Sequence, residues 1–387
     1  MKDSNPQCNI CGNILPEPLY DSGTGASITS LCRIVDAHTR VRQCRLCSHV
    51  QTDSVFDSST YYQKEYDILA ESEEEDQIYL VVDGKPIFRS DYQVTTLLEK
   101  LDLKSNIRML DYGCAKSATY RKLSMRRPDL DLNLFDVSER YIEFWSSFVD
   151  RYKWAVGEIP DEWNGSFDVV TSFFAFEHIS TPIDSLRSAV AMLKPGGRFY
   201  CVVPNIFTNT ADFIVVDHEN HFTESSIAAM FRHAGFSSIQ IDGSAHRGAF
   251  VIIGTKSDQQ HVLSEAEQNN FFSEYDATKI GEYWSAAAER IRAFESTLGR
   301  DDSIAVYGAG FYGTFMTAAL SKPEKVRCYV DQNPFLQGRL LHEKWPILHP
   351  AKLPDDISAL LVGLNPTQAR TIIDSLPSLH HLRTFFL

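Results

Sequence analysis

Between about residue 93 and residue 256, short apolar segments alternate with segments of helical period, and this alternation restricts the fold more than any other feature. The helix-like TTLLEKL precedes the apolar run Ile107–Leu110, and the later strand-like segments are LNLFD, FDVVTSFF, GGRFYCVVP and FVIIGT. Strands that alternate with helices build an open, mainly parallel sheet whose ligands bind at the carboxyl ends of the strands. We therefore predict an α/β fold for this part of the chain.

Two of the predicted strands end in residues that suit a nucleotide-like ligand. The first apolar strand ends in Asp111-Tyr-Gly-Cys-Ala-Lys-Ser, and the next strand closes on Asp136. Gly113 lets the backbone turn tightly toward a ligand, and an acid that ends the second strand can accept hydrogen bonds from both hydroxyls of a ribose. The sequence thus predicts a ribose-containing ligand at this edge of the sheet.

Four cysteines near the N-terminus have the spacing of a zinc site. They form two Cys-x-x-Cys pairs: Cys8, Cys11, Cys44 and Cys47. Each pair brings two thiolates onto one tight turn, and four such ligands complete a closed tetrahedral site with no position left for a substrate. We predict a structural Zn²⁺, because a short segment with so few apolar residues needs such a ligand to fold. We interpret the remaining cysteines as isolated small apolar residues: Cys32, Cys114, Cys201 and Cys328.

The C-terminal part carries a second nucleotide-binding pattern. The strand-like SIAVY is followed by Gly308-Ala-Gly-Phe-Tyr-Gly313 and a helical segment, and VRCYV closes on Asp331. Glycines for a tight turn, a helix N-terminus and an acid about 20 residues further on satisfy the spacing of a Rossmann unit. No Tyr-x-x-x-Lys pattern for hydride transfer follows, and few residues remain after Asp331. We therefore expect a small Rossmann-like half that is architectural or binds a diphosphate.

One polar segment, Val216-Asp-His-Glu-Asn-His-Phe-Thr223, lies between a strand-like and a helix-like run and permits three interpretations. His218, Glu219 and His221 could bind a metal if a further ligand lay nearby. An imidazole in this segment could instead serve as a general base near neutral pH. Thr223-x-x-Ser226 could also cap the helix that follows.

The charge and hydropathy of the chain exclude several classes of protein. A formal net charge of −14 at pH 7 disfavours a nucleic-acid partner, because such binding depends on Lys and Arg that neutralise phosphates. No run of 18 apolar residues occurs, and the N-terminus lacks the basic-then-apolar pattern of a secretion signal. We expect a cytoplasmic protein with no membrane partner, and we interpret the acidic run Glu71 to Asp76 as a solvated segment without a function.

The middle of the chain resembles class I S-adenosylmethionine-dependent methyltransferases. LDYGCAKS, the FD at 135–136, SFDVVTSFFAFEHI and LKPGGRFYCVVPN follow one another in the order typical of that family. The resemblance implies S-adenosylmethionine as the cofactor, with its methionine part on the glycine loop, its ribose on the second-strand acid and its adenine near Glu158. The implied cofactor residues are Asp111, Gly113, Ala115, Asp136, Val137 and Glu158. Ala115 and Ser117 stand where the family pattern D-x-G-x-G-x-G has its later glycines.

Taken as a whole, the chain resembles the bacterial sugar C-methyltransferases that act on nucleotide-linked deoxysugars. The zinc-type cysteines, the methyltransferase segment and the C-terminal VYGAG…VDQNP…QG pattern carry this resemblance. It implies methylation of a carbon beside a keto group, through an enolate formed by a histidine base. By alignment with the family, His218 is the base and Asp217 its orienting partner. His178 is implied to stabilise the enolate or bind substrate, and Tyr66 to contact a substrate hydroxyl.

These patterns predict four segments and one leading function. The segments are a zinc-binding domain (1–65), a methyltransferase domain (66–260), a helical linker (261–298) and a small Rossmann-like domain (299–387). The segment from about residue 71 to residue 89 is longer than in the sugar C-methyltransferase family. The leading function is S-adenosylmethionine-dependent C-methylation of a nucleotide-linked ketodeoxysugar.

Three alternative functions stay open. An O-methyltransferase on a sugar or small metabolite is one, because a histidine base serves a hydroxyl equally well. An NAD-dependent oxidoreductase that uses GAGFYG is another, and a zinc-ribbon binding module with a degenerate methyltransferase domain is the third. The sequence makes no prediction of the particular sugar or of the oligomeric state.

Overall fold

The structure is a computed structural model of the chain, and it describes residues 6–23, 25–55, 60–66, 72–82, 85–257, 276–334 and 336–387. The chain divides into two compact units, which we describe one at a time. The first unit comprises Met1–Pro16, Gln43–Asn209 and Glu219–Asp276, and the second comprises Glu17–Arg42, Thr210–His218 and Ala277–Leu387.

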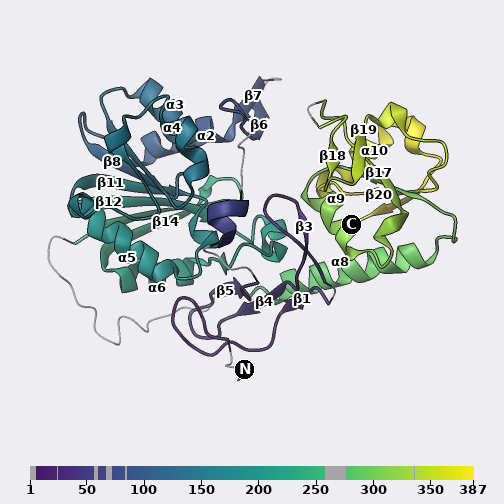
Figure 1. The fold of residues 1–387 in the computed structure, drawn as a ribbon. Coiled ribbons are helices and arrows are strands. Elements are labelled where there is room, and N and C mark those ends of the chain that lie inside the picture. Colours follow the sequence, from purple (N-terminus) through teal and green to yellow (C-terminus); the bar gives the residue numbers. More distant parts are fainter. Residues whose placement is uncertain are drawn as a thin grey trace. The chain divides into compact units, whose positions relative to one another are not determined.

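The first unit is built on a seven-stranded sheet with the order β10-β9-β8-β11-β12-β15-β14 (Figure 1). Its strands are β8 (Arg108–Tyr112), β9 (Asp131–Asp136), β10 (Trp154–Val156), β11 (Phe167–Phe173), β12 (Leu193–Pro204), β14 (Phe236–His246) and β15 (Ala249–Lys256). The first five run parallel, and β15 lies antiparallel between β12 and β14. The predicted α/β sheet is confirmed, although the sequence pattern does not predict the short β10 or the polar β14.

Helices cover both faces of this sheet (Figure 1). They are α2 (Arg89–Lys100), α3 (Ala118–Arg126) and α4 (Ile142–Trp145) on one face, and α5 (Pro182–Met192) and α6 (Glu224–Ala234) on the other. Each face has its own apolar core, with Tyr120 and Trp145 fully buried on the first and Phe199 and Phe231 on the second. The strand order reverses between β8 and β11, which places the ligand crevice of such a sheet at the ends of these two strands.

Two small antiparallel strand pairs complete the first unit, one between distant segments and one between consecutive strands. β5 (Val50–Thr52) pairs antiparallel with β13 (Asn220–His221), and β6 (Ile78–Val82) pairs with β7 (Lys85–Phe88). A helical turn, η1, spans Tyr61–Glu65. Shorter 3₁₀ turns are η2 (Glu139–Tyr141), η3 (Arg151–Lys153), η4 (Asp161–Trp163) and η5 (Phe176–His178).

The second unit contains a six-stranded sheet with the order β18-β19-β17-β16-β20-β21. Its elements are β16 (Ile304–Tyr307), α9 (Phe311–Ala319), η7 (Pro323–Lys325), β17 (Val326–Val330), β18 (Leu340–Leu341), β19 (Trp345–Leu348), η8 (Pro350–Lys352), β20 (Ala359–Val362), α10 (Pro366–Asp374), η9 (Pro377–Leu379) and β21 (Arg383–Phe386). All strand pairs except β18 with β19 are parallel. The expected Rossmann-like half is therefore an underestimate, because the residues after Asp331 add strands on both sides of β16 and β17.

The boundaries of the two units differ from the predicted segments. The second unit also holds β1 (Tyr20–Asp21), β2 (Ala26–Ile28), β3 (Ile34–Asp36), β4 (Arg40–Gln43), η6 (Thr210–Ile214) and the long helix α8 (Thr278–Ser296). Residues 17–42 pack against α8 at such short range that a Cβ on Gly281 would lie 2.4 Å from the Leu19 carbonyl oxygen. The helical part of the predicted linker corresponds to α8, and its residues 261–275 lie outside the described residues.

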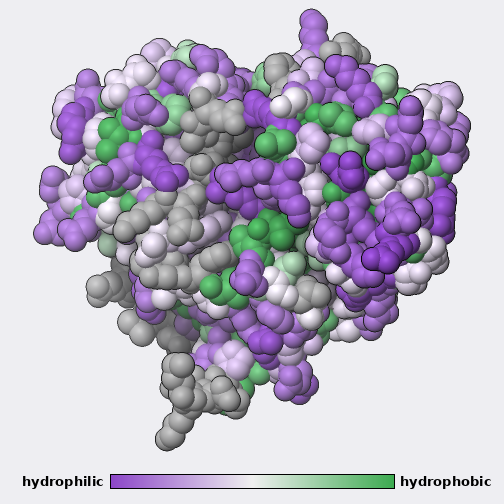
Figure 2. Space-filling model, turned by 45° about the vertical axis from the view of Figure 1, so that its right-hand side comes forward, coloured by the Kyte–Doolittle hydropathy of each residue, from purple (hydrophilic) through white to green (hydrophobic). Residues whose placement is uncertain are grey.

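Hydrophilic side chains cover most of the face drawn in Figure 2, and hydrophobic side chains form smaller patches among them. Among the described helices, none combines the length and the apolar character needed to cross a membrane.

Candidate cofactor and acceptor site

The loop after β8 has the tight backbone that the glycine predicted. Gly113 has φ +71°, and a Cβ at this position would lie 2.8 Å from the Cβ of Ala175. The amide groups of Gly113 and Cys114 both donate to the carbonyl oxygen of Phe135, at 2.9 and 3.1 Å. Only glycine fits here, so the loop is held against the end of β9.

Ala115 and Ser117, at the later glycine positions of the family pattern, both have a left-handed backbone. Their φ angles are +44° and +56°, in a region that non-glycine residues enter at a cost of roughly 1–2 kcal/mol. The Ala115 carbonyl oxygen accepts a hydrogen bond from the Trp145 indole at 2.7 Å, and the Ser117 hydroxyl donates to Asp111 at 2.8 Å. These buried partners hold the loop in its strained form.

The two predicted carboxylates lie below and beside this loop. Asp136 accepts hydrogen bonds from the amides of Ala115 (2.7 Å) and Ser138 (2.9 Å), and burial raises its pKa. Asp111 accepts from the hydroxyls of Ser117 and Thr171, and burial raises its pKa to about 7. Asp111 therefore supports the loop from below, whereas Asp136 stands at the end of the second strand.

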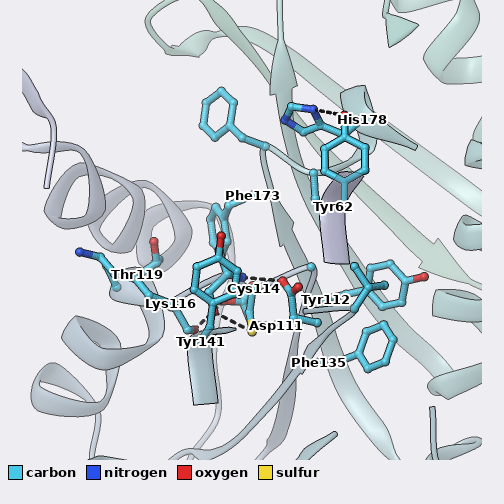
Figure 3. A pocket seen from close by; sticks show the side chains of 18 of the residues that line it. Tyr62, Asp111, Tyr112, Cys114, Lys116, Thr119, Phe135, Tyr141, Phe173 and His178 are labelled. Atoms are coloured by element: carbon cyan, nitrogen blue, oxygen red, sulfur yellow. Dashed lines mark hydrogen bonds between the residues drawn. The ribbon is translucent and has the colours of Figure 1, made fainter. Parts of the chain in front are cut away.

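A cavity of about 450 Å³ lies over this loop, entirely within the first unit (Figure 3). The predicted residues that line it are Tyr66, Asp111, Gly113, Ala115, Asp136, Val137 and His178. Val137 is 43% exposed at this cavity, whereas Glu158 is exposed on the turn after β10 and is absent from the lining. The expected adenine contact of Glu158 is therefore not supported by the cavity, because its side chain points to solvent.

Aromatic side chains from η1 and from the residue that follows it form the wall of the cavity next to His178. The Tyr62 hydroxyl lies 2.9 Å from Nδ1 of His178, and the Tyr66 ring lies 5.3 Å from the imidazole between centroids. Figure 3 shows the side chains of Tyr62 and His178 in contact at this wall. Tyr62 is therefore a further residue at His178 beside the predicted Tyr66, and no local sequence pattern marks it.

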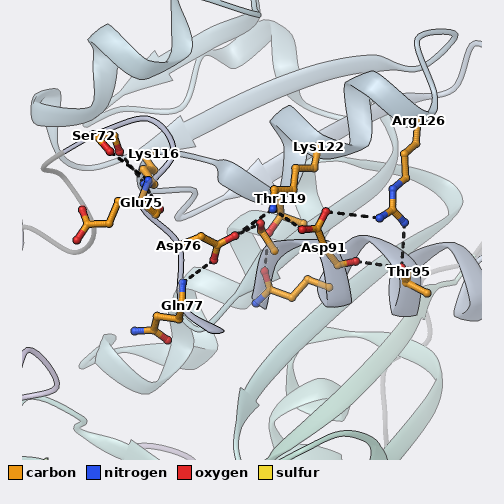
Figure 4. Close-up of polar contacts among 12 residues, drawn as sticks. Ser72, Glu75, Asp76, Gln77, Asp91, Thr95, Lys116, Thr119, Lys122 and Arg126 are labelled. Carbon is orange, nitrogen blue, oxygen red and sulfur yellow. Dashed lines mark hydrogen bonds and ion pairs between the residues drawn. The ribbon is translucent and has the colours of Figure 1, made fainter. Parts of the chain in front are cut away.

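The acidic run is solvated as expected at Glu73 and Glu74, which are exposed, but Glu75 and Asp76 are half-buried. Lys116, which is 4% exposed, donates to the carbonyl oxygens of Ser72 and Glu75 (Figure 4). Asp76 lines the cavity and pairs with Lys122 at 3.2 Å. Within the described residues 72–76, Asp76 therefore forms part of the cavity wall, and the backbone of Ser72 and Glu75 binds Lys116 just before α3. Glu71 lies outside the described residues.

The four predicted zinc ligands converge in the first unit. The sulfur atoms of Cys8 and Cys47, and those of Cys11 and Cys44, are 3.5 Å apart, and all four lie within 4.8 Å of one another. The backbone amide of Ile10 donates to the Cys8 sulfur, and that of Leu46 donates to the Cys44 sulfur, each at 3.4 Å. Four convergent thiols with amide donors fit a tetrahedral Zn²⁺ with Zn–S distances of about 2.3 Å.

The segment 216–223 divides between the two units. In the second unit, Nδ1 of His218 lies 2.8 Å from the Asp212 carboxylate, whereas Asp217 accepts hydrogen bonds from the Ser30 amide and hydroxyl at 2.6 and 2.7 Å. The prediction that Asp217 orients His218 is therefore wrong, because Asp212 contacts the imidazole instead. No sequence pattern marks Asp212. Asp217 instead fixes the turn at Ser30.

The remaining polar residues of this segment have structural partners in the first unit. Glu219 accepts from the Ser54 hydroxyl at 2.9 Å, and Nε2 of His221 lies 2.9 Å from the Thr52 hydroxyl. Thr223 and Ser226 form a reciprocal capping box at the start of α6. The predicted helix cap is confirmed.

Comparison with known proteins identifies the middle of the chain. Residues 89–241 match the family model described as a methyltransferase domain. Ubiquinone biosynthesis O-methyltransferases match at 32% identity over 106 residues in Xanthomonas oryzae pv. oryzae and at 26% over 117 residues in Dechloromonas aromatica. The enzyme of that name from Xanthomonas euvesicatoria matches at 27% over 155 residues.

These matches are partial on both sides. They cover 26%, 29% and 35% of this chain and 44%, 50% and 65% of the relatives, so the chain spans about half the length of the curated relatives that it matches. The solved structure of the YcgJ protein from Bacillus subtilis matches 43% of this chain and 99% of its own at 17% identity, with a TM-score of 0.36. Residues 89–241 are a methyltransferase domain in a chain that extends beyond that domain on both sides.

Proposed function

We propose that this chain is an S-adenosylmethionine-dependent methyltransferase. The cavity over the Gly113 loop carries this proposal, because it combines a glycine turn, the carboxylate of Asp136 at the end of the second strand and a methyltransferase family match. The residues present fit S-adenosylmethionine: Asp136 would bind the ribose and the loop would hold the methionine part. When bound, the cofactor supplies an electrophilic methyl group on sulfur.

For the acceptor we propose a carbon beside the keto group of a nucleotide-linked deoxysugar. This step rests on the sequence resemblance, and the aromatic wall of Tyr62, Tyr66 and His178 supports it with groups suited to a polar ring. Methylation of an oxygen is the second candidate, since the relatives that match the domain are named O-methyltransferases.

We further propose His218 as the general base. This role rests on the sequence resemblance, and the Asp212 carboxylate at Nδ1 supports it, because it would fix the imidazole tautomer with Nε2 as the basic nitrogen, as in other carboxylate-oriented histidines. His218→Ala should abolish turnover and leave S-adenosylhomocysteine affinity unchanged, and Asp212→Asn should lower turnover and shift its pH profile. Turnover near that of the wild type in His218→Ala would refute this role.

The experiment is an incubation of the purified protein with S-adenosylmethionine and a panel of nucleotide-linked 4-keto sugars in deuterated water, followed by mass spectrometry. A product heavier by one methyl group, with deuterium exchange beside the ketone when donor is omitted, is the expected result. Methylation without exchange would assign the reaction to oxygen. A purified protein that binds no S-adenosylhomocysteine would exclude methyl transfer altogether.

We also propose a structural Zn²⁺ on the four cysteines. Metal analysis of the purified protein should then find one zinc per chain, and chelation should lower the thermal midpoint and release thiols that react with a disulfide reagent. Four reactive thiols and no zinc in the untreated protein would contradict the assignment.

A further inference from the structure

Arg89 brings a guanidinium group into the cavity wall. It is the first residue of α2, it is only partly exposed, and it lines the cavity together with Phe174 and His178. Its guanidinium carbon lies 3.7 Å from the centroid of the Phe174 ring. Phe174 directly follows β11 and has φ +54°, so a strained residue holds the ring in place. The ring covers one face of the guanidinium and leaves the donors along its edges.

Most of the hydrogen-bond donors of Arg89 have no acceptor in the described part of the chain. A guanidinium carries five N–H donors. Nη1 of Arg89 donates to the Gln77 side-chain oxygen at 2.9 Å. Among the residues that the structure describes, no carboxylate lies within 4.0 Å of the Arg89 guanidinium. A cation that is partly withdrawn from water and has no anionic partner is unfavourable. The Arg89 guanidinium is therefore suited to bind an anionic group of a ligand.

The charged groups near Arg89 also leave its guanidinium without an ion pair among the described residues. Burial lowers the pKa of Arg89, and the charge of Glu177, which is 1% exposed, acts on it in the opposite direction without forming an ion pair. Lys116 is the other Lys or Arg that lines the cavity, and two carbonyl oxygens already occupy its ammonium group. Among the described lining residues, Arg89 therefore keeps more donors for a ligand than Lys116, whose ammonium group has one donor beyond the two carbonyl contacts.

The lining around Arg89 is that of the acceptor rather than of the cofactor loop. Phe174 lies at the end of β11, and the charges of Tyr66 and Glu177, which neighbour His178, act on Arg89. We propose that Arg89 is a specificity-determining residue that binds an oxyanion of the methyl acceptor, a phosphate or a carboxylate group. Its planar fork can donate two parallel hydrogen bonds to either group. This inference rests on the proposed function, because it presumes that the cofactor fills the other half of the cavity.

The test uses the full chain saturated with S-adenosylhomocysteine and two probes, inorganic pyrophosphate for phosphates and malonate for carboxylates. Calorimetry measures both probes on the wild type and on Arg89→Met, Arg89→Lys and Lys122→Met. Lys122 is the matched control, because it is a cation of the neighbouring α3 that pairs with Asp76 and Asp91 and does not line the cavity. Thermal midpoints verify that each variant is folded.

The expected result is that one probe binds the wild-type complex, that Arg89→Met weakens it at least tenfold and that Arg89→Lys retains part of the affinity. Lys122→Met should bind the probe as the wild type does, and all variants should bind S-adenosylhomocysteine within twofold of one another.

Weakened cofactor binding in Arg89→Met would overturn the inference, because the guanidinium would then hold the cofactor carboxylate. Equal probe binding in wild type and Arg89→Met would overturn it as well. Failure of the wild type to bind S-adenosylhomocysteine would instead refute the proposed function.

Discussion

At the scale of single residues, the cofactor loop is maintained in a strained conformation by its neighbours. Ala115 has φ +44°, a value that glycine adopts without steric cost. The hydrogen bonds from the Trp145 indole to the Ala115 carbonyl and from the Ala115 amide to Asp136 hold it there. The loop thus keeps the backbone of a glycine-rich pattern although two of the glycines are absent.

This strain predicts an unusual response to glycine. Ala115→Gly should change the free energy of unfolding by less than about 1 kcal/mol, because relief of roughly 1–2 kcal/mol of strain offsets the larger chain entropy of glycine in the unfolded state. Ala228→Gly, inside α6, should lose about 1 kcal/mol. Urea unfolding compares the two variants, and an equal loss in both would show that Ala115 is not strained.

Asp111 predicts a pH dependence of stability. Its pKa is raised by burial from the ordinary 3.8 to about 7, so between these values the folded chain holds a proton that the unfolded chain has lost. The stabilisation is complete below pH 4 and is lost as the pH rises through 7, by an amount on the order of a few kcal/mol. Unfolding free energies of wild type should therefore fall relative to Asp111→Asn between pH 5 and pH 7. A constant difference across this range would contradict the raised pKa.

At the scale of elements, α6 begins with a buried reciprocal cap. The Thr223 hydroxyl accepts from the Ser226 amide at 3.1 Å, and the Ser226 hydroxyl accepts from the Thr223 amide at 2.9 Å. Both side chains are 0% exposed, so water does not replace either partner when one is removed.

Removal of this cap should be costly. Thr223→Ala should lower the free energy of unfolding by about 1–2 kcal/mol, toward the upper end of measured cap losses because the site is buried. Ser188→Ala on the exposed side of α5 is the matched control and should change stability by less than about 0.5 kcal/mol. Denaturant midpoints for both variants provide the measurement, and a Thr223→Ala midpoint equal to that of the control would show that the cap is dispensable.

At the scale of the whole molecule, the sequence predicted what short-range patterns encode. Five strands of the first sheet, β8, β9, β11, β12 and β15, were predicted because each is an apolar run, and the loop after β8 was predicted because a glycine follows a strand there. The convergence of the four cysteines was predicted because each Cys-x-x-Cys pair is a short-range pattern that lies on one turn.

Features that depend on contacts between distant segments were missed. Tyr62 meets His178 across 116 positions, and Gly281 meets Leu19, which assigns residues 17–42 to the second unit. Asp212 and Arg89 carry no local motif, so only the fold shows that one orients His218 and the other lines the cavity. The extent of the second sheet was underestimated because β19, β20 and β21 are short and follow no glycine pattern.

The two sheets also offer a matched comparison. Asp331 accepts from the amides of Ala309 (2.9 Å) and Asn333 (2.8 Å), as Asp136 accepts from those of Ala115 and Ser138. One geometry therefore occurs in both units, but the described cavity lies over Asp136.

The most direct test is calorimetric titration of the wild type, Asp136→Asn and Asp331→Asn with S-adenosylhomocysteine and with NAD. S-adenosylhomocysteine should bind the wild type and Asp331→Asn equally, and Asp136→Asn should bind it at least tenfold more weakly, because the substitution replaces one of the two acceptor oxygens with an NH₂ donor. No binding of NAD is expected. Unchanged S-adenosylhomocysteine affinity in Asp136→Asn, or binding of NAD that is lost in Asp331→Asn without any binding of S-adenosylhomocysteine, would contradict the proposed cofactor site.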